Sequence, residues 1–437
     1  MIVFLPCYVA VLALLYLELR GVAVVPSIRS PRWPAWAWIA VLVVSYAASL
    51  GIVWYAAATV AAAVPWRQSL PIPVAEHGMA HPDAVEAALL ALAAVQTFAL
   101  AGLYQSAASR AVLTAGLLGI LALSLAAPAF VSPDPYAYVG DALLGRAAYA
   151  PPVAPFAGEF ASIDRLFHPL LPAPYGPVWL ALARWVTDPF PALAGKLMAL
   201  RALGALSYLG LLAALRAYGV PSRILAVAAV NPLLAQQYVA DAHNDLLGIA
   251  VIVAAAALLR VRRTDDGAIA VAVSALVKLP FVAIALPIFA RIRGRAARCA
   301  WYAATVAAAV LVSWWGGGAA YFRGLTVHVP AAGAVYFFNA AVAIAAISLL
   351  VLAAAGARRL ASALWIVPMM GSYVATWYML YGLPYALARR RLLAYLLIAL
   401  PVASALVDAK FMRPWTYFAA LPVTLAVSLL FARRRWV

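Results

Sequence analysis

The chain alternates long apolar runs with short clusters of arginine. Of its 437 residues, 68% are hydrophobic and only 10% are charged. A soluble fold cannot hide that much apolar surface, so these runs must face lipid. They are long and rich in alanine and leucine rather than short and alternating, which excludes a transmembrane β-barrel. The sequence therefore predicts an all-α polytopic membrane protein.

The arginine clusters predict the orientation of the chain. They lie between apolar runs, for example at 260–263, 291–298, 358–359, 389–391 and 433–435. Short loops of this kind face the cytoplasm by the positive-inside rule. The net charge of +17 is therefore explained by topology. A nucleic-acid-binding surface would instead place lysines and aromatics on a soluble domain, so no nucleic-acid partner is expected.

Hydropathy and charge parity together predict about 11 to 14 membrane segments. The expected crossings are 2–19, 35–60, 85–104, 111–129, 197–215, 224–240, a following helix that ends at Arg260, 299–314, 334–356, 392–407 and 416–432. This order places the loop from Ser132 to Trp179 on the extracytoplasmic side, and residues 175–186 along that face. No linker divides the chain, so we expect one membrane-embedded domain over 1–437. It is subdivided into N-terminal helices (1–110), a core (111–390) and C-terminal helices (391–437).

Residues 267–290 lie between two basic loops and must enter and leave the membrane on one side. Each arm has about 12 residues and rises about 18 Å, less than a bilayer core of about 30 Å. We therefore expect a re-entrant hairpin with Lys278 near its apex. A lysine at that depth needs a polar cavity or an anion, which favours a phosphate site. A salt bridge to an acidic side chain is the alternative.

The loop from Ser132 to Trp179 carries the densest polar chemistry of the chain. Asp134 follows the end of an apolar run and opens the sequence DPYAY, where a carboxylate can act as a general base. Its alternative role is to cap a helix, because Asp before Pro is a good N-cap pair. Asp141 is the rival base, since it lies two helical turns further along the same face.

A second polar cluster, Asp241–Asp245, contains His243 and Asn244 and opens a helix on the same predicted side. It suits contacts to sugar hydroxyls or pyrophosphate, or simple helix capping by Asn or Asp. One histidine with two aspartates is weak evidence for a metal. Nucleotide-binding glycine motifs and zinc spacings are absent from the sequence, so we expect no cofactor and no metal.

Four motifs in order resemble the GT-C superfamily of membrane glycosyltransferases. They are closest to the polyprenyl-phosphomannose-dependent mannosyltransferases, including the α-1,6 enzymes of lipomannan assembly. The motifs are DPYAYVGDALL at Asp134–Leu144, PAPYGPVW at Pro172–Trp179, NPLL with AHND at Asn231–Asp245, and ALVKLP at Ala275–Pro280. Trp377 and Tyr378 give a weaker fifth match, and the resemblance spans about 130–390. It implies that 111–390 is a GT-C-like catalytic core, whereas residues 1–110 show no specific match to the family.

The resemblance implies a GT-C-like fold and assigns roles to residues. Asp134 would be the general base, and Lys278 with Arg201 and Arg323 would bind the donor phosphate. A phosphate is a good leaving group, so a second carboxylic acid is not required, in contrast to glycoside hydrolysis. The expected sugar- and acceptor-binding residues are Tyr136, Tyr138, Tyr175, Trp179, His243, Asn244, Asp245, Trp377 and Tyr378. Aromatics at this depth also form the ordinary interfacial belt.

The resemblance predicts an inverting enzyme of cell-envelope glycan biosynthesis in the cytoplasmic membrane. It would move one sugar, mannose, from a polyprenyl-phosphate donor to a glycan or glycolipid acceptor on the extracytoplasmic face, among membrane lipids. The alternative is a flippase or transporter of a lipid-linked sugar, which would use the same hairpin and lysine for passage.

Overall fold

A computed structural model describes residues 32–61, 82–127, 132, 134–152, 156–163, 171–279, 281–289, 292–327, 380–387 and 390–408. Every regular element within these ranges is helical, as the apolar runs predict. The predicted crossings at 2–19, 334–356 and 416–432 lie outside the described residues, as do Trp377 and Tyr378.

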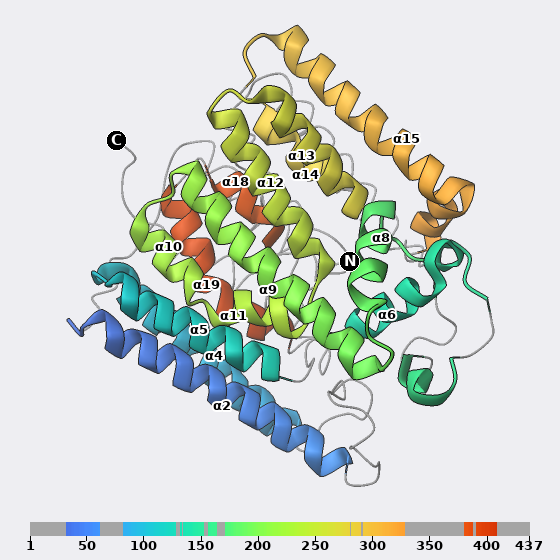
Figure 1. Cartoon of the computed structure of the whole chain (residues 1–437). Helices are drawn as coiled ribbons and strands as arrows, with labels where there is room; N and C mark the ends of the chain where they lie inside the picture. The colour runs from blue at the N-terminus through green and yellow to red at the C-terminus, as the bar shows by residue number, and fades with distance from the viewer. Residues whose placement is uncertain are drawn as a thin grey trace, which may run out of the picture.

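The N-terminal helices form one layer of the molecule (Figure 1). Helices α2 (Ala35–Ala61) and α4 (Pro82–Gln105) pack against one another, and α5 (Arg110–Ala126) packs on α2. Helix α5 begins where the Ser109 hydroxyl accepts a hydrogen bond from the Val112 N–H, which satisfies one of the unpaired donors of a helix start. Helix α19 (Arg390–Asp408) packs on α4.

The polar loop after α5 contains short helices. Helix α6 (Asp134–Leu144) leads into η3 (Gly145–Tyr149), followed by η4 (Gly158–Phe160) and α8 (Pro177–Thr187). Helix α8 has 11 residues, which at 1.5 Å per residue gives roughly 17 Å, too short to cross a bilayer. This length agrees with the prediction that residues 175–186 do not cross.

A broken helix forms the centre of the molecule. Helix α9 (Leu193–Tyr218) is followed by α10 (Ser222–Ala229), α11 (Pro232–Ala235), η5 (Gln236–Ala240) and α12 (Asn244–Arg260). The chain bends by 116° between Pro232–Ala240 and Asn244–Arg260. Segment η5 is a π-helix, and such segments occur mostly at functional sites. The bend leaves residues 241–243 as irregular backbone, which lipid tolerates only where protein or a cavity surrounds it.

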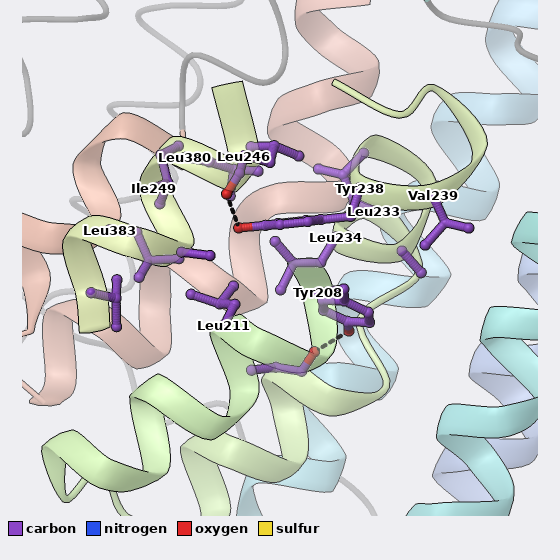
Figure 2. Close-up of a cluster of buried hydrophobic side chains, with 14 of the residues drawn as sticks. Tyr208, Leu211, Leu233, Leu234, Tyr238, Val239, Leu246, Ile249, Leu380 and Leu383 are labelled. Atoms are coloured by element: carbon purple, nitrogen blue, oxygen red, sulfur yellow. Dashed lines mark hydrogen bonds between the residues drawn. The ribbon is translucent and has the colours of Figure 1, made fainter. Parts of the chain in front are cut away.

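Large buried side chains hold this break in place (Figure 2). Tyr208 and Tyr238 are at most 1% exposed, and their rings lie 5.5 Å apart. The Tyr208 hydroxyl donates to the Ala228 carbonyl, and the Tyr238 hydroxyl donates to the Leu246 carbonyl at 2.9 Å. Asn231 caps α11 and donates to the Leu397 carbonyl at 2.7 Å. The asparagine of the NPLL motif is therefore a structural residue that ties the break to α19.

The predicted hairpin contains a helix break at its expected apex. Helix α13 (Thr264–Val277) ends at Lys278, and α14 (Phe281–Phe289) follows. The two helices contact one another and also contact α12 and α15 (Arg295–Val327). Neither α13 nor α14 reaches the length of a crossing helix. The short helix α18 (Leu383–Ala386) packs against α12 and α14.

The described residues contain four helices long and apolar enough to cross a membrane, or five if the bent pair counts as one span. The four are Ala35–Trp54, Ala84–Gln105, Leu193–Tyr218 and Arg295–Leu325. These helices confirm an all-α polytopic membrane protein. The total of 11 to 14 segments stays a prediction, because it includes ranges outside the described residues.

Candidate active site

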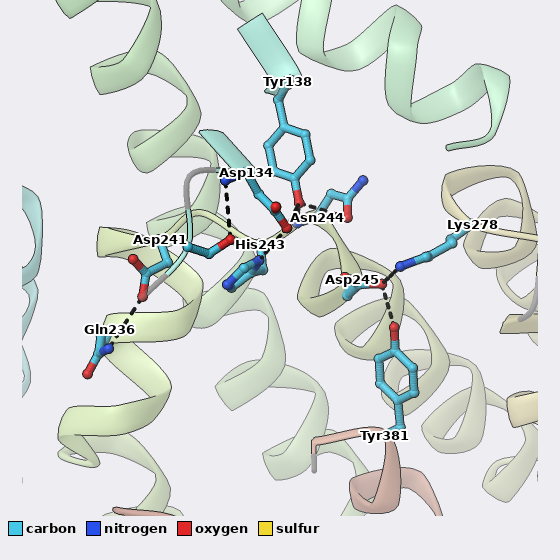
Figure 3. A network of polar contacts seen from close by, with 10 residues as sticks. Asp134, Tyr138, Gln236, Asp241, His243, Asn244, Asp245, Lys278 and Tyr381 are labelled. Carbon is cyan, nitrogen blue, oxygen red and sulfur yellow. Dashed lines mark hydrogen bonds and ion pairs between the residues drawn. The ribbon is translucent and has the colours of Figure 1, made fainter. Parts of the chain in front are cut away.

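Three segments that are distant in the sequence bring polar side chains together. They are the start of α6, the break before α12 and the end of α13 (Figure 3). The 116° bend directs residues 243–245 toward α6 and α13. The polar cluster of the sequence is therefore formed by a helix break rather than by an exposed loop.

Asp134 is the first residue of α6, and its carboxylate is held by side chains. Its Oδ2 lies 3.2 Å from His243 Nδ1 and 3.3 Å from the Tyr138 hydroxyl. That hydroxyl also lies 3.2 Å from the Asn244 amide oxygen and accepts a hydrogen bond from the Asn244 N–H. The Asp134 side chain is 24% exposed, whereas that of His243 is fully covered. His243 and Tyr138 therefore hold one carboxylate oxygen of Asp134, while the side chain as a whole stays partly exposed.

The surroundings of Asp134 keep it ionised. Burial alone would raise the pKa of this carboxyl, but the hydrogen bond and charge of His243 lower it. Ser132 and the charge of Lys278 act in the same direction, and the resulting pKa lies below the ordinary value. An ionised carboxylate that accepts hydrogen bonds is the state that a general base requires.

Lys278 forms an ion pair within the same network. Its ammonium lies 2.6 Å from Asp245 Oδ1, and the Tyr381 hydroxyl donates to the same oxygen at 2.5 Å. The Lys278 side chain is 17% exposed, and that of Asp245 is 1% exposed. The predicted salt-bridge alternative for Lys278 is confirmed. The ion pair positions the cation while its side chain stays partly accessible.

Aromatic rings pack beside Asp134 and Lys278. The Tyr138 ring makes edge contacts with Tyr175 and Trp179, at centroid distances of 5.2 and 5.0 Å. The Lys278 ammonium lies 5.7 Å from the centre of the Tyr175 ring, which is within cation–π range. Gly176 permits this arrangement, because a Cβ there would lie 2.1 Å from the Leu276 carbonyl oxygen. The glycine of the PYGPVW motif therefore lets α8 approach α13.

Asp141 has a different environment from Asp134. It is 2% exposed, and its Oδ1 makes no hydrogen bond to any described residue. Burial raises its pKa well above the ordinary value, and the charge of Asp134 raises it further. A carboxyl that holds its proton is a poor base at neutral pH. The structure therefore favours Asp134 over its rival.

Arg201 lies in a separate, buried cluster. It is 4% exposed and donates from Nε to the Ala240 carbonyl at 3.1 Å and from Nη1 to the Leu125 carbonyl at 3.3 Å. Gln236 donates to Asp241 at 3.4 Å in the same region, and Arg201 is close enough to interact with the Asp241 charge. These contacts hold the end of η5, so the structure does not group Arg201 with Lys278.

Two other predicted binding residues, Tyr136 and Arg323, also lie apart from Asp134 and Lys278. Tyr136 is 1% exposed and interacts with the charge of Arg201, so it belongs with the buried cluster. Arg323 is exposed on α15. Within the described ranges, no three His, Cys, Asp or Glu side chains come together in a way that could hold a metal ion.

Two capping interpretations from the sequence do not account for the site. The described contacts of the Asp134 carboxylate are to side chains, and its own N–H donates to the Ser132 hydroxyl. The expectation that Asn or Asp of the 241–245 cluster caps α12 is wrong. His243 occupies the N-cap position and makes no side-chain capping bond. The bend directs these side chains into the site instead.

Sequence reasoning missed Tyr381 and the pairing of His243 with Asp134. Tyr381 lies three residues after Tyr378, so the aromatic run around Trp377 was a signal for it. Its partner, Asp245, is 136 residues away, and no local pattern reveals such a contact.

Comparison with known proteins assigns the family. A model described as alpha-(1->6)-mannopyranosyltransferase, N-terminal domain, matches residues 35–295. The match covers more than half of the chain, including Asp134, Asp245 and Lys278. It begins at residue 35, so the expectation that residues 1–110 show no match to the family is wrong for 35–110. Neither a curated protein nor a solved structure matches the chain. The chain belongs to the α-(1→6)-mannopyranosyltransferase family of GT-C-like glycosyltransferases, and its reaction is the transfer of mannose.

Proposed function

We propose that the chain transfers one mannose from a polyprenyl-phosphate donor to a hydroxyl of a glycan or glycolipid acceptor, with inversion, on the extracytoplasmic face. The observation that carries this proposal is the juxtaposition of a held, partly exposed carboxylate with a held, partly exposed cation. Asp134 and Lys278 are 24% and 17% exposed at their side chains, and the Lys278 charge acts on Asp134. A base and a phosphate ligand are the two groups that this reaction needs.

Asp134 is the general base in this proposal. His243 and Tyr138 both approach Oδ2, so Oδ1 is the oxygen that takes the proton of the acceptor hydroxyl. The acceptor oxygen then attacks the anomeric carbon as the bond to the phosphate oxygen breaks. The electron pair leaves with the polyprenyl phosphate, and the configuration at the anomeric carbon inverts. Positioned proton transfer of this kind contributes about 10²- to 10⁴-fold to the rate.

Lys278 stabilises the departing phosphate. A cation that faces a developing negative charge in a site with little water lowers the barrier of the step. Asp245 and Tyr381 hold the ammonium in place, and no acid is needed to protonate this leaving group. The half-buried ring of Tyr175 offers an apolar face for the sugar, and the buried rings of Tyr138 and Trp179 support it from behind. Irregular backbone at the break would accommodate the polar end of a lipid-linked substrate.

The family match makes an enzyme the better account than a flippase, because a transporter needs no general base. The test is transfer by the purified protein from polyprenyl-phosphomannose to a short mannoside, with the anomeric configuration of the product read by NMR. We expect a product of configuration opposite to that of the donor. Retention of configuration, or transfer from a nucleotide sugar alone, would overturn the proposal.

A further inference from the structure

The hydroxyl of Tyr138 faces two acceptors but has one proton to donate. Its oxygen lies 3.3 Å from Asp134 Oδ2 and 3.2 Å from the Asn244 amide oxygen. The Asn244 N–H donates to the same hydroxyl at 3.4 Å, so the phenol oxygen already serves as an acceptor on that side. Because a strong hydrogen bond needs good alignment, the proton can point well at only one of the two acceptors at a time.

Burial makes the direction of this proton important. Tyr138 is fully buried and Asn244 is 1% exposed, and a polar group so placed depends on its protein partners. The Asn244 amide nitrogen makes no hydrogen bond within the described ranges. The engaged part of this side chain is therefore the oxygen that faces Tyr138, which makes Asn244 an acceptor in competition with Asp134.

The fold brings the two residues together from segments far apart in the chain. Tyr138 lies in α6, and Asn244 is the first residue of α12, 106 positions further on. Edge contacts with Tyr175 and Trp179 hold the Tyr138 ring, so rotation of its O–H bond is the freedom that remains. Before Asn244, the backbone of Ala242 has a φ of 45°, a costly conformation for a residue with a Cβ, and such strain persists mainly at functional sites.

The charge of Asp134 determines which acceptor receives the Tyr138 proton. An ionised carboxylate accepts a stronger hydrogen bond than a neutral amide, so Tyr138 donates to Asp134 before the reaction. When Oδ1 of Asp134 takes the proton of the acceptor hydroxyl, the carboxyl loses its charge and becomes the weaker acceptor. The O–H bond of Tyr138 then turns to Asn244. The Tyr138 proton stays on its own oxygen throughout, so no further proton transfer is required.

We propose that Tyr138 and Asn244 are positioning residues that act on Asp134 in opposite directions, because Tyr138 stabilises its ionised form and Asn244 stabilises its protonated form. This inference deepens the proposed function and rests on it, since it assumes that Asp134 is the general base. Asn244 acts only through Tyr138, because its amide oxygen contacts the tyrosine hydroxyl.

Substitution of the two residues should move the pKa of Asp134 in opposite directions. Tyr138→Phe removes a donor to the carboxylate, so this pKa should rise and the acid limb of kcat/KM should move to higher pH by about one unit. Asn244→Leu removes the competing acceptor and keeps the backbone N–H. Tyr138 then donates to Asp134 alone, so the pKa should fall and the limb should move to lower pH by about half a unit.

The double variant tests whether Asn244 acts through Tyr138. It should give the same acid limb as Tyr138→Phe, because Asn244 then has no hydroxyl to attract. Tyr238→Phe is the control, since it removes another buried hydroxyl, bonded to the Leu246 carbonyl, and should leave the limb in place. All four variants keep the other described titratable groups that act on Asp134 or on Tyr138, which are His243, Lys278, Asp141, Tyr175 and Asp245.

A measurement without turnover separates this inference from the proposed function. A hydrophobic carbodiimide modifies protonated carboxyls, so the pH dependence of its labelling of Asp134 reports the protonation of that residue in the full-length protein in detergent. Mass spectrometric fragments distinguish Asp134 from Asp141. We expect the labelling midpoint to rise in Tyr138→Phe, to fall in Asn244→Leu and to match Tyr138→Phe in the double variant.

The outcomes of labelling and kinetics are distinguishable. Midpoints that stay in place, that move in the same direction in both single variants, or that differ between Tyr138→Phe and the double variant would overturn the inference. If the midpoints move as expected but the acid limb of kcat/KM does not follow them, Asp134 is not the base. The proposed function then fails, although the two residues still act on the Asp134 charge.

Discussion

Two clusters of opposite charges lie on either side of the break before α12, and they differ in access. In the open cluster (Asp134, His243, Asp245 and Lys278), the base and the cation keep 24% and 17% of their side chains exposed. In the closed cluster (Arg201, Gln236 and Asp241), Arg201 and Asp241 are 4% and 0% exposed. The sequence offers both clusters as binding sites. Access indicates that the first serves the substrate and the second holds the fold.

The largest effect on stability should come from the closed cluster. Arg201→Met leaves the Asp241 charge buried and the carbonyls of Leu125 and Ala240 without their donor. Breaking a buried charge cluster in this way costs about 3–5 kcal/mol. Arg184→Met is the control, because Arg184 and Asp188 are 59% and 58% exposed and such pairs contribute at most about 1 kcal/mol. If Arg201→Met and Arg184→Met have the same thermal unfolding temperature, the cluster around Arg201 does not stabilise the fold.

Lys278→Met should raise donor KM, in addition to the stability lost because the buried Asp245 carboxylate no longer has its cation. Loss of a charge-assisted contact to phosphate, about 1.5–3 kcal/mol, corresponds to a rise in donor KM of roughly 10- to 100-fold. Lys196→Met removes another buried ammonium, which donates to the Thr187 carbonyl at 3.0 Å. This control should affect stability more than donor KM. A donor KM that rises equally in both variants would contradict the assignment of Lys278 to phosphate.

Tyr381→Phe should give a smaller effect of the same kind. Tyr381 is a positioning residue, since it acts on Lys278 through Asp245, and loss of its bond should raise donor KM by about three- to tenfold. Tyr238→Phe also deletes one buried hydroxyl, whose partner is the Leu246 carbonyl. Steady-state kinetics should show the KM change only in Tyr381→Phe. If both lower stability alike and neither changes KM, Tyr381 has only a structural role.

The smallest effect concerns pH. The base must be ionised, so kcat/KM falls as the pH drops through the pKa of Asp134. His243, Ser132 and Lys278 lower this pKa against the effect of burial. His243→Gln removes the charge of His243, so the acid limb of the pH profile should move to higher pH. A limb that stays in place, or moves to lower pH, would show that His243 does not act on the base.

The sequence predicts the helices better than the contacts between them. Apolar runs and charge clusters predicted α2, α4 and α9 within a few residues, and they predicted the break at Lys278 because the arms are too short to cross. The 116° bend before α12 has no comparable local signal. It depends on Tyr208, Tyr238 and Asn231, which are packed by segments far apart in the chain.

For the candidate site, the charged residues could be predicted from the sequence, but their partners could not. Asp134, Asp245 and Lys278 were predicted because charges at the edge of apolar runs are costly and therefore informative. Arg201 was grouped with them for the same reason, although its charge serves the fold. The free-energy cost of burying a charge shows only that the charge needs a partner. It does not reveal whether that partner is a carbonyl or a substrate.

The most direct test of the account is the turnover of Asp134→Asn and Asp141→Asn with polyprenyl-phosphomannose and a dimannoside acceptor. We expect Asp134→Asn to lose at least about 100-fold in kcat, in the range of general-base catalysis, while it keeps its fold and its donor binding. Asp141→Asn should lose far less kcat, because the buried Asp141 carboxyl holds its proton and is a poor base. An inactive Asp141→Asn beside an active Asp134→Asn would contradict the account.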